Sequence, residues 1–289
     1  MMSSRSAMRR ATSSCSQGEG SAGMWRQRRA AAGSMVGGRS LVIAAEYIDP
    51  MSGKLIQTLS HALPRALPKA LPSQCAVCHA WPADPVCEPC VVRFAQPQPR
   101  CQTCALPVPA GVARCGRCLK APPPLDACVA AVSYEYPWSG LIASYKFNGN
   151  AGWASSFAAL LRSTPWAEPA LDAADCLLPM PLSRQRLKER GFNQALTLAR
   201  ALDRQKTQAR VLLRIKDTPA QSSLGREDRQ ASVKDAFAVE PFLAAGLRGK
   251  RLVLVDDVMT SGASMYAAAR ALRSAGAAHI TGLVIARTE

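Results

Sequence analysis

Long apolar runs are absent from this chain of 289 residues. No stretch approaches the roughly 18 consecutive apolar residues that a membrane-spanning helix needs. Residues 1–38 also lack the apolar core of a secretory signal. Acidic residues are few, because 20 Asp and Glu accompany 36 Lys and Arg, and the formal net charge is +16. The sequence therefore predicts no membrane span, and it favours anionic partners such as phosphates, nucleic acid or a membrane surface.

The first 74 residues differ in composition from the rest of the chain. Residues 1–50 are rich in Ser, Ala, Gly and Arg and are expected to form a disordered basic tail. A transit peptide, or a true start near Met51, are the alternatives. Residues 51–74 are expected to be a linker, because Pro64, Pro68 and Pro72 prevent a regular helix.

Cysteine, by contrast, is plentiful, and eight of the 11 cysteines form Cys-x-x-Cys pairs. Two such pairs can surround one tetrahedral zinc ion, so the chain predicts two structural sites in a double zinc ribbon over residues 75–120. Clustered thiols of this kind are typical of a reducing cytoplasm rather than of a disulfide scaffold. The pairs are Cys75 and Cys78, Cys87 and Cys90, Cys101 and Cys104, and Cys115 and Cys118.

The simplest arrangement joins the first pair with the second and the third with the fourth. Other pairings remain open, and His79 is an alternative ligand. Redox-active pairs and iron–sulfur clusters are rival interpretations of Cys-x-x-Cys, but the number and spacing of the pairs favour zinc. Cys128 and Cys176 lie in apolar strand contexts and are expected to be core residues.

From Asp126 onward, short apolar runs alternate with amphipathic segments, which is typical of an α/β domain. Such a domain has a parallel sheet flanked by helices and binds ligands at the carboxyl ends of its strands. We expect strands at 128–136, 176–181, 211–215, 252–255 and 280–285, and helices at 141–147, 153–161, 193–202 and 265–275. The segment 216–234 is predicted to be a polar loop.

The run from Arg251 to Ser264 is the most informative part of this domain. After the expected strand 252–255 come the carboxylates of Asp256 and Asp257, a turn of small residues and a helix start. Backbone N–H groups at a helix start bind phosphate, and paired carboxylates hold ribose hydroxyls or hydrated Mg²⁺. The run lacks the Gly-Lys-Ser/Thr of a Walker A loop. It resembles the phosphoribosyl-pyrophosphate (PRPP) loop of type I phosphoribosyltransferases.

Three further segments carry polar chemistry. Residues 178–184 end a buried strand and meet a basic segment that could surround a pyrophosphate. Arg190-Gly-Phe-Asn-Gln194 places a charge, a turn glycine and two amides at a helix start. The polar stretch 218–229 is long enough to be a lid over a site.

Taken in order, these pieces resemble the ComF family, which consists of competence-associated, phosphoribosyltransferase-like proteins with an N-terminal double zinc ribbon. The resemblance covers about residues 75–289 and implies a type I phosphoribosyltransferase-like domain at 126–289. Asp256 and Asp257 would bind the ribose hydroxyls and Mg²⁺, and Arg229 in the lid Gln221–Arg229 would join them in catalysis. The 5′-phosphate would contact Thr260, Ser261, Gly262, Ala263 and Ser264, and the pyrophosphate would contact Leu182, Ser183 and Arg184.

The chain departs from the family pattern at two places. Ser232 stands where the family usually has Asn, three residues after the lid arginine. Ser261 and Ala263 stand where many relatives have Thr and Ser. Neither change removes a group that phosphate binding requires.

The resemblance implies a cytoplasmic protein that binds PRPP with Mg²⁺ and acts in DNA uptake, natural transformation or the use of external DNA. Transfer to an acceptor is expected, although no residue identifies the acceptor and no glutaminase domain is present. The alternative is a non-catalytic adaptor for single-stranded DNA or a competence helicase. In that case Arg184, Arg186, Lys188 and Arg190 are the candidate contacts to the phosphate backbone.

Overall fold

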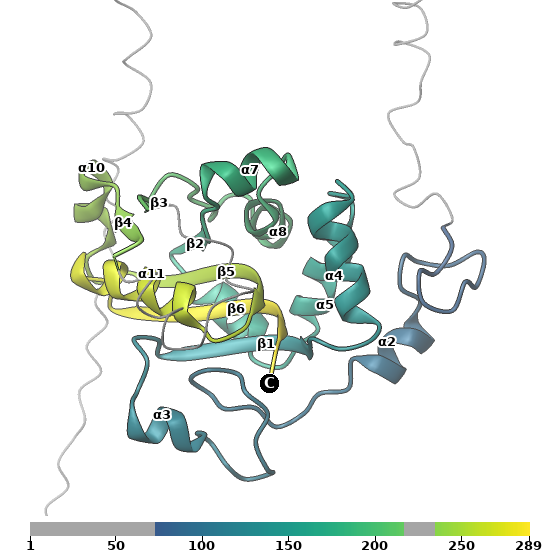
Figure 1. Cartoon of the computed structure of the whole chain (residues 1–289). Helices are drawn as coiled ribbons and strands as arrows, with labels where there is room; N and C mark the ends of the chain where they lie inside the picture. Colours follow the sequence, from purple (N-terminus) through teal and green to yellow (C-terminus); the bar gives the residue numbers. More distant parts are fainter. Residues whose placement is uncertain (1–72, 217–234) are drawn as a thin grey trace, which may run out of the picture. The chain divides into compact units, whose positions relative to one another are not determined.

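A computed structural model of the chain describes residues 73–216 and 235–289. Four parallel strands form its main sheet (Figure 1), as the alternating pattern predicts. They are β1 (Ala127–Ser133), β2 (Cys176–Pro179), β5 (Arg251–Met259) and β6 (His279–Arg287), in the order β1-β6-β5-β2. Four of the five strands expected from apolar runs are thus confirmed in this sheet, and the α/β fold class with them. The tail, the linker, the lid with Arg229, and Ser232 lie outside the described residues.

Both faces of the sheet are buried, and the alternation of side chains along β5 shows how. Leu252 and Leu254 belong to the apolar cluster that includes the buried residues of α11 (Ala263–Ser274). Val253 and Val255 belong to a second cluster that includes α5 (Trp153–Arg162) and α8 (Gln194–Leu202). Because successive strand residues point to opposite faces, each β-branched or Leu residue of this run fills one of two cores.

The helices follow the apolar periodicity of the sequence. In α5, Trp153, Phe157 and Leu161 recur at helical spacing and are buried together. Helix α4 (Trp138–Phe147) buries its N-terminal tryptophan and Tyr145 in the same cluster. The short α6 (Ala167–Asp172) lies in a segment for which no helix was expected.

Outside the main sheet, one expectation needs correction. The segment 211–215 does form a strand, β3 (Leu212–Arg214), but it pairs antiparallel with β4 (Phe237–Val239) in a separate two-stranded sheet. A short helix, α10 (Pro241–Ala244), and a 3₁₀ turn (Ala245–Leu247) then lead into β5. The basic segment after Ser183, for which no element was expected, is a helix, α7 (Arg184–Arg190).

The ends of α7 explain why a segment without apolar periodicity is helical. The hydroxyl of Ser183 accepts a hydrogen bond from the backbone N–H of Arg186 at 3.2 Å and so caps the first turn. Gly191, with φ of +76°, ends the helix in the left-handed conformation that glycine adopts at little cost. The caps, not a buried apolar face, set the bounds of α7.

The cysteine-rich module contributes two short helices, α2 (Glu88–Phe94) and α3 (Gly116–Lys120). Backbone and side-chain hydrogen bonds join it to the sheet domain. The Trp138 indole N–H donates to the Phe94 carbonyl at 2.7 Å, and the Cys128 N–H donates to the Gln102 carbonyl at 2.8 Å. Among the helices of the described residues, none has the length and apolar character to cross a membrane.

Candidate functional site

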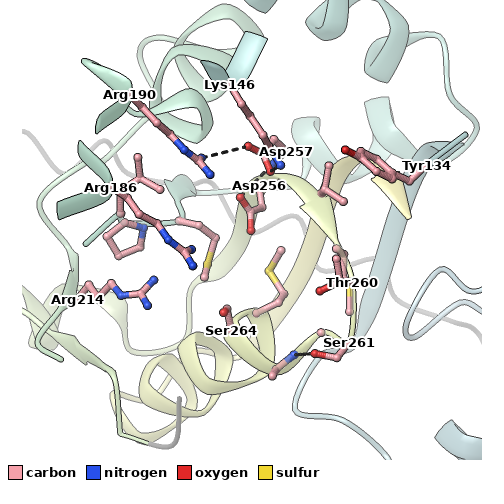
Figure 2. A pocket seen from close by; sticks show the side chains of 18 residues that line it. Tyr134, Lys146, Arg186, Arg190, Arg214, Asp256, Asp257, Thr260, Ser261 and Ser264 are labelled. Atoms are coloured by element: carbon pink, nitrogen blue, oxygen red, sulfur yellow. Dashed lines mark hydrogen bonds and ion pairs between the residues drawn. The ribbon is translucent and has the colours of Figure 1, made fainter. Parts of the chain in front are cut away.

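A cavity of about 260 Å³ opens where β2 and β5 end (Figure 2). Its walls come from the segment after β2, from the basic helix α7, from the end of β5 and from the first turn of α11. This is the edge of a parallel sheet at which ligands bind. Its polar and charged lining residues are Tyr134, Lys146, Arg186, Arg190, Arg214, Asp256, Asp257, Thr260, Ser261 and Ser264.

The paired carboxylates lie within β5 and not beyond its end, which corrects the expected strand boundary. Asp256 pairs with Val284 of β6 in the parallel ladder, and this pairing carries the strand on to Met259. Asp257 is buried and forms ion pairs with Lys146 Nζ at 2.9 Å and Arg190 NH1 at 3.9 Å. Asp256 accepts a hydrogen bond from the Asp257 N–H at 2.9 Å. Both carboxylates line the cavity.

The two carboxylates differ in their electrostatic environment. Burial, followed by repulsion from Asp257, raises the pKa of Asp256 to about 7, although Lys146 and Arg190 oppose this shift. Asp257 contacts both cations directly. Near neutral pH Asp256 is therefore close to its titration point, while Asp257 is held by its two cationic partners.

The turn after β5 requires glycine at one position. Gly262 has φ of +82°, and a Cβ there would lie 2.6 Å from Met259 Cε and from Tyr266 Cζ. Helix α11 begins immediately afterwards at Ala263, two residues earlier than expected, so Ser264 lies in its first turn. The Ser261 hydroxyl accepts a hydrogen bond from the Ala263 N–H at 3.4 Å. The predicted phosphate-binding residues Thr260 to Ser264 all line the cavity.

The predicted pyrophosphate loop is only partly at the cavity. Leu182 lines it, together with Met180 and Pro181. Ser183 is buried, and its hydroxyl caps α7. Arg184 is exposed and does not line the cavity.

Helix α7 presents basic side chains in two directions. Arg186 and Arg190, four residues apart, line the cavity, as Figure 2 shows. Arg184 and Lys188, also four residues apart, are exposed and outside its lining. The four residues predicted to contact nucleic acid are therefore divided between the cavity and the solvent-exposed side of one helix.

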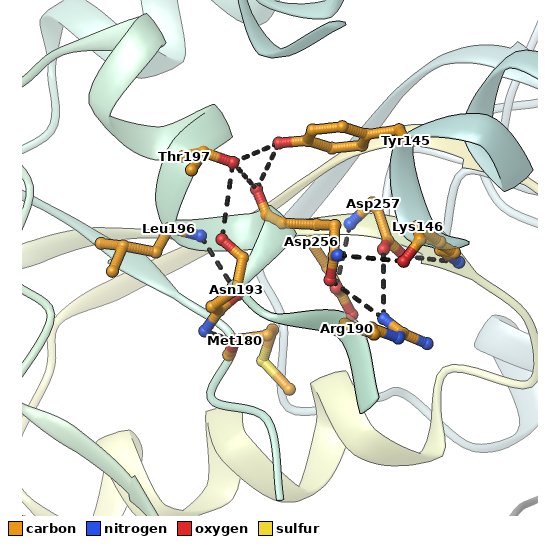
Figure 3. A network of polar contacts seen from close by, with 10 residues as sticks. Tyr145, Lys146, Met180, Arg190, Asn193, Leu196, Thr197, Asp256 and Asp257 are labelled. Atoms are coloured by element: carbon orange, nitrogen blue, oxygen red, sulfur yellow. Dashed lines mark hydrogen bonds and ion pairs between the residues drawn. The ribbon is translucent and has the colours of Figure 1, made fainter. Parts of the chain in front are cut away.

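The Arg190–Gln194 motif organises this end of the sheet (Figure 3). Gln194, which is buried, accepts a hydrogen bond from Arg190 NH1 at 3.1 Å and donates to the Lys146 carbonyl at 3.4 Å. Asn193 caps α8 through the Leu196 N–H at 3.2 Å and donates to the Met180 carbonyl at 3.1 Å. The expected cluster of a charge and amides at a helix start is confirmed, and it fixes Arg190 toward Asp257.

Three lining residues were not singled out from the sequence, namely Lys146, Arg214 and Tyr134. Lys146 is at the end of α4, more than 100 residues before its partner Asp257 in the printed sequence. No local motif marks such a pairing.

The cysteines form two groups, in the sequential pairing that the spacing favoured. Within each group, all four sulfur atoms lie within 4.8 Å of one another. One group is Cys75, Cys78, Cys87 and Cys90, and the other is Cys101, Cys104, Cys115 and Cys118. His79 belongs to neither group.

The two groups repeat one local geometry. Cys87 caps α2 and its N–H donates to Cys75 Sγ at 3.4 Å, while Cys115 caps α3 and its N–H donates to Cys101 Sγ at 3.3 Å. Burial raises the pKa of Cys101. Hydrogen bonds from the backbone N–H groups of Cys115, Thr103 and Cys104 outweigh this effect and lower the pKa to about 6. Four sulfur donors, one of them stabilised as a thiolate by N–H groups, suit a closed tetrahedral zinc site. Cys128 is buried in the core, and Cys176 is partly buried.

Comparison with known proteins gives consistent matches. The family model described as the phosphoribosyl transferase domain matches residues 188–288. The DNA utilization protein YhgH of Escherichia coli K12 is 30% identical over 214 residues, which span 70% of this chain and 90% of that protein. Competence protein F of Haemophilus influenzae is 30% identical over 195 residues, spanning 63% and 82%. Competence protein ComFC of Bacillus subtilis is 32% identical over 148 residues, spanning 51% and 58%.

Proposed function

Because this chain belongs to the ComF/YhgH family, with a phosphoribosyltransferase domain and two four-cysteine clusters, we propose that its cavity binds PRPP with Mg²⁺. One observation carries the proposal. A carboxylate pair, a glycine turn at a helix start and two inward-facing arginines line the same cavity. Ribose hydroxyls, a 5′-phosphate and a pyrophosphate each have matching groups there.

Each part of the ligand has a proposed position. Asp256 and Asp257 accept hydrogen bonds from the ribose hydroxyls, and the N–H groups from Ser261 to Ser264 bind the 5′-phosphate. Arg186 and Arg190 face the cavity and bind the pyrophosphate as charge-assisted donors. Lys146 adds a further positive charge beside Asp257. The cationic side chains outnumber the carboxylates, which suits a polyanion.

The carboxylate pair also fits a magnesium ion, which prefers oxygen ligands and retains several waters. Asp256 is the more available of the two, because Asp257 already contacts Lys146 and Arg190. When bound, Mg²⁺ supplies positive charge to the pyrophosphate leaving group.

We further propose that the domain transfers the phosphoribosyl group. The bond between ribose C1 and the pyrophosphate oxygen breaks, and pyrophosphate leaves with the electron pair. A lone pair of the acceptor forms the new bond to C1, and the acceptor's proton passes to solvent. Arg186 and Arg190 would stabilise the charge that develops on the leaving group.

The two cysteine groups are proposed to hold one zinc ion each. Four thiolates leave no open coordination position, so these ions would stabilise the module and take no part in the transfer.

A second candidate function rests on the exposed side of α7 and on the names of the relatives, which refer to DNA utilization and competence. Arg184 and Lys188 would contact the phosphates of single-stranded DNA during its uptake or use. In this adaptor the cavity would serve as a PRPP sensor.

Calorimetric titration of the full chain with PRPP and Mg²⁺ tests the first proposal. We expect saturable binding by the wild type and none by Asp256→Ala/Asp257→Ala. The matched control is Glu168→Ala/Asp172→Ala, which removes two acids of α6 that do not line the cavity. Absence of binding by the wild type would refute PRPP recognition. Pyrophosphate release in the presence of amines or bases then separates the transferase from the adaptor.

A further inference from the structure

Arg287, near the end of β6, is a buried cation that joins two distant parts of the chain. Its side chain is 1% exposed. The guanidinium Nε donates to the Cys104 carbonyl at 2.9 Å, and NH1 donates to the Met259 carbonyl at 2.9 Å. NH1 also donates to the carbonyl of Thr260. One side chain thus connects the second cysteine cluster with the segment that begins the phosphate turn.

The described residues provide no carboxylate within ion-pair distance of this guanidinium. A buried charge without a counter-charge is costly. Four thiolates around a divalent zinc carry a net negative charge. The complex of zinc with four thiolates in the second cluster would therefore supply the missing negative charge.

Packing reinforces the connection for this cluster and not for the other. Cys101, Cys104 and Cys118 belong to the same apolar core as Met259 and Ala263, which flank the phosphate turn. The residues around the first cluster, among them Val77, Val86 and Val91, instead pack against the core on the α5 side.

We propose that Arg287 is a positioning residue that couples metal occupancy of the second cysteine cluster to the shape of the 5′-phosphate turn. The inference rests on the proposed function of the cavity and assigns a role to a residue outside it. With the metal bound, the cluster holds Arg287, and Arg287 holds the carbonyls of Met259 and Thr260. The N–H groups of the following turn then point into the cavity. Loss of the metal weakens phosphate binding without any change in a ligand-contacting side chain.

The test compares two halves of the ligand in full-length variants. Ribose 5-phosphate probes the turn, and inorganic pyrophosphate with Mg²⁺ probes the side of the cavity formed by α7. Cys115→Ser/Cys118→Ser disrupts the second cluster, and Cys87→Ser/Cys90→Ser disrupts the equivalent positions of the first. Zinc content and circular dichroism verify that each variant has lost one metal and remains folded.

We expect Cys115→Ser/Cys118→Ser to bind ribose 5-phosphate about tenfold more weakly, the size typical of losing an outer partner of a metal site. Its affinity for pyrophosphate should change by less than about twofold, within the scatter of distant substitutions. Cys87→Ser/Cys90→Ser should leave both affinities near those of the wild type.

Arg287→Lys provides a second arm that leaves all cysteines intact. Lysine keeps the charge but lacks the planar fork that spans separate carbonyls. We expect this variant to retain its zinc and its pyrophosphate affinity while it loses ribose 5-phosphate affinity. If the second-cluster variant unfolds, this arm decides the question by itself.

The measurements distinguish failure of the proposed function from failure of the coupling alone. A wild type that binds neither ligand refutes the proposed function and the coupling with it. A wild type that binds both, with unchanged affinity in Arg287→Lys, refutes the coupling alone. Equal losses for ribose 5-phosphate and pyrophosphate, or equal effects of the two cluster variants, also refute it, because they indicate general destabilisation.

Discussion

Lys146 and Asp257 are largely buried side chains that neutralise one another at the wall of the cavity, 2.9 Å apart. Removing one member of a buried pair leaves the other charge without its main partner. Arg190 remains, but at 3.9 Å it compensates only in part. Lys146 is therefore the cavity residue whose loss should most affect stability.

For Lys146→Met we expect the free energy of unfolding to fall by about 2–4 kcal/mol, near the range for breaking a buried ion pair. Urea denaturation followed by circular dichroism measures it. Lys188→Met is the matched control, because this exposed lysine has no carboxylate ion-pair partner among the described residues and should change stability by less than about 0.5 kcal/mol. Equal stability of the two variants would contradict the prediction.

Asp256 makes PRPP binding depend on pH. Its pKa in the folded chain is about 7, above the ordinary 3.8, so the carboxyl gains its proton as pH falls through 7. Ribose hydroxyls and hydrated Mg²⁺ require the ionised form. We expect PRPP affinity to fall by up to about tenfold per pH unit below 7, the limit for one linked proton. Titrations from pH 8 to 6 measure this.

Asp256→Asn controls for the titration of the ligand's own phosphates. Its weaker binding should retain only the ligand's pH dependence. A wild-type profile parallel to that of the variant would disprove the assignment. The unliganded fold should show the opposite trend, because a raised pKa favours the protonated folded state. Its unfolding free energy should decrease as pH rises from the ordinary pKa of 3.8 to about 7.

At the scale of elements, the turn between β5 and α11 depends on one backbone conformation. Gly262→Ala places a Cβ against Met259 and Tyr266 at a positive φ. We expect a loss of about 1–3 kcal/mol in stability, the usual cost of such strain, and a marked loss of ribose 5-phosphate affinity. Gly246→Ala is the control, since no atom lies within 4 Å of its added Cβ. Thermal unfolding measures the stability of the two variants, and calorimetry measures their affinity for ribose 5-phosphate. Wild-type affinity in Gly262→Ala would be inconsistent with the proposed turn.

The sequence predicted most elements because their apolar patterns are local. The helices around Phe157 and Leu198 and the core strands carry complete periodic signals. The end of β5 carries no such periodic signal, because Asp256 and Asp257 disfavour a strand. Only the pairing with β6 extends β5 through these residues. Helix α7 has caps but no buried face. The antiparallel pairing of β3 depends on β4, more than twenty residues later, and therefore has no local signature.

In the site, too, local motifs were recognisable from the sequence and contacts between distant residues were not. The carboxylates, the phosphate turn and the Arg190–Gln194 motif are contiguous and were recognisable. Lys146 and Arg287 were not, because each acts on a partner far away in the chain. Contacts that depend on tertiary structure leave no spacing to detect.

At the scale of the whole molecule, the net charge of +16 favours binding to polyanions in general. The second candidate function requires more, namely contacts at defined side chains. For Lys188→Gln we expect the slope of log affinity for single-stranded DNA against log salt to decrease by about 0.7, the value for one phosphate contact. Gel-shift titrations at several salt concentrations measure the slope. Lys250→Gln removes an equal charge from a lysine that pairs with Asp175 and is the control. An unchanged slope in Lys188→Gln would remove α7 from the proposed DNA surface.

Gln194 has a mechanical consequence. Its side-chain amide contacts Arg190 in α7 with one end and the Lys146 carbonyl in α4 with the other. A displacement of α7 toward a bound polyanion would therefore move α4 in the same direction, because the Gln194 amide is hydrogen-bonded to both helices. Trp138 is the first residue of α4, and its indole N–H donates to the Phe94 carbonyl in the cysteine-rich module. Movement that starts at the cavity would thus be transmitted to the cysteine-rich module, which does not line the cavity.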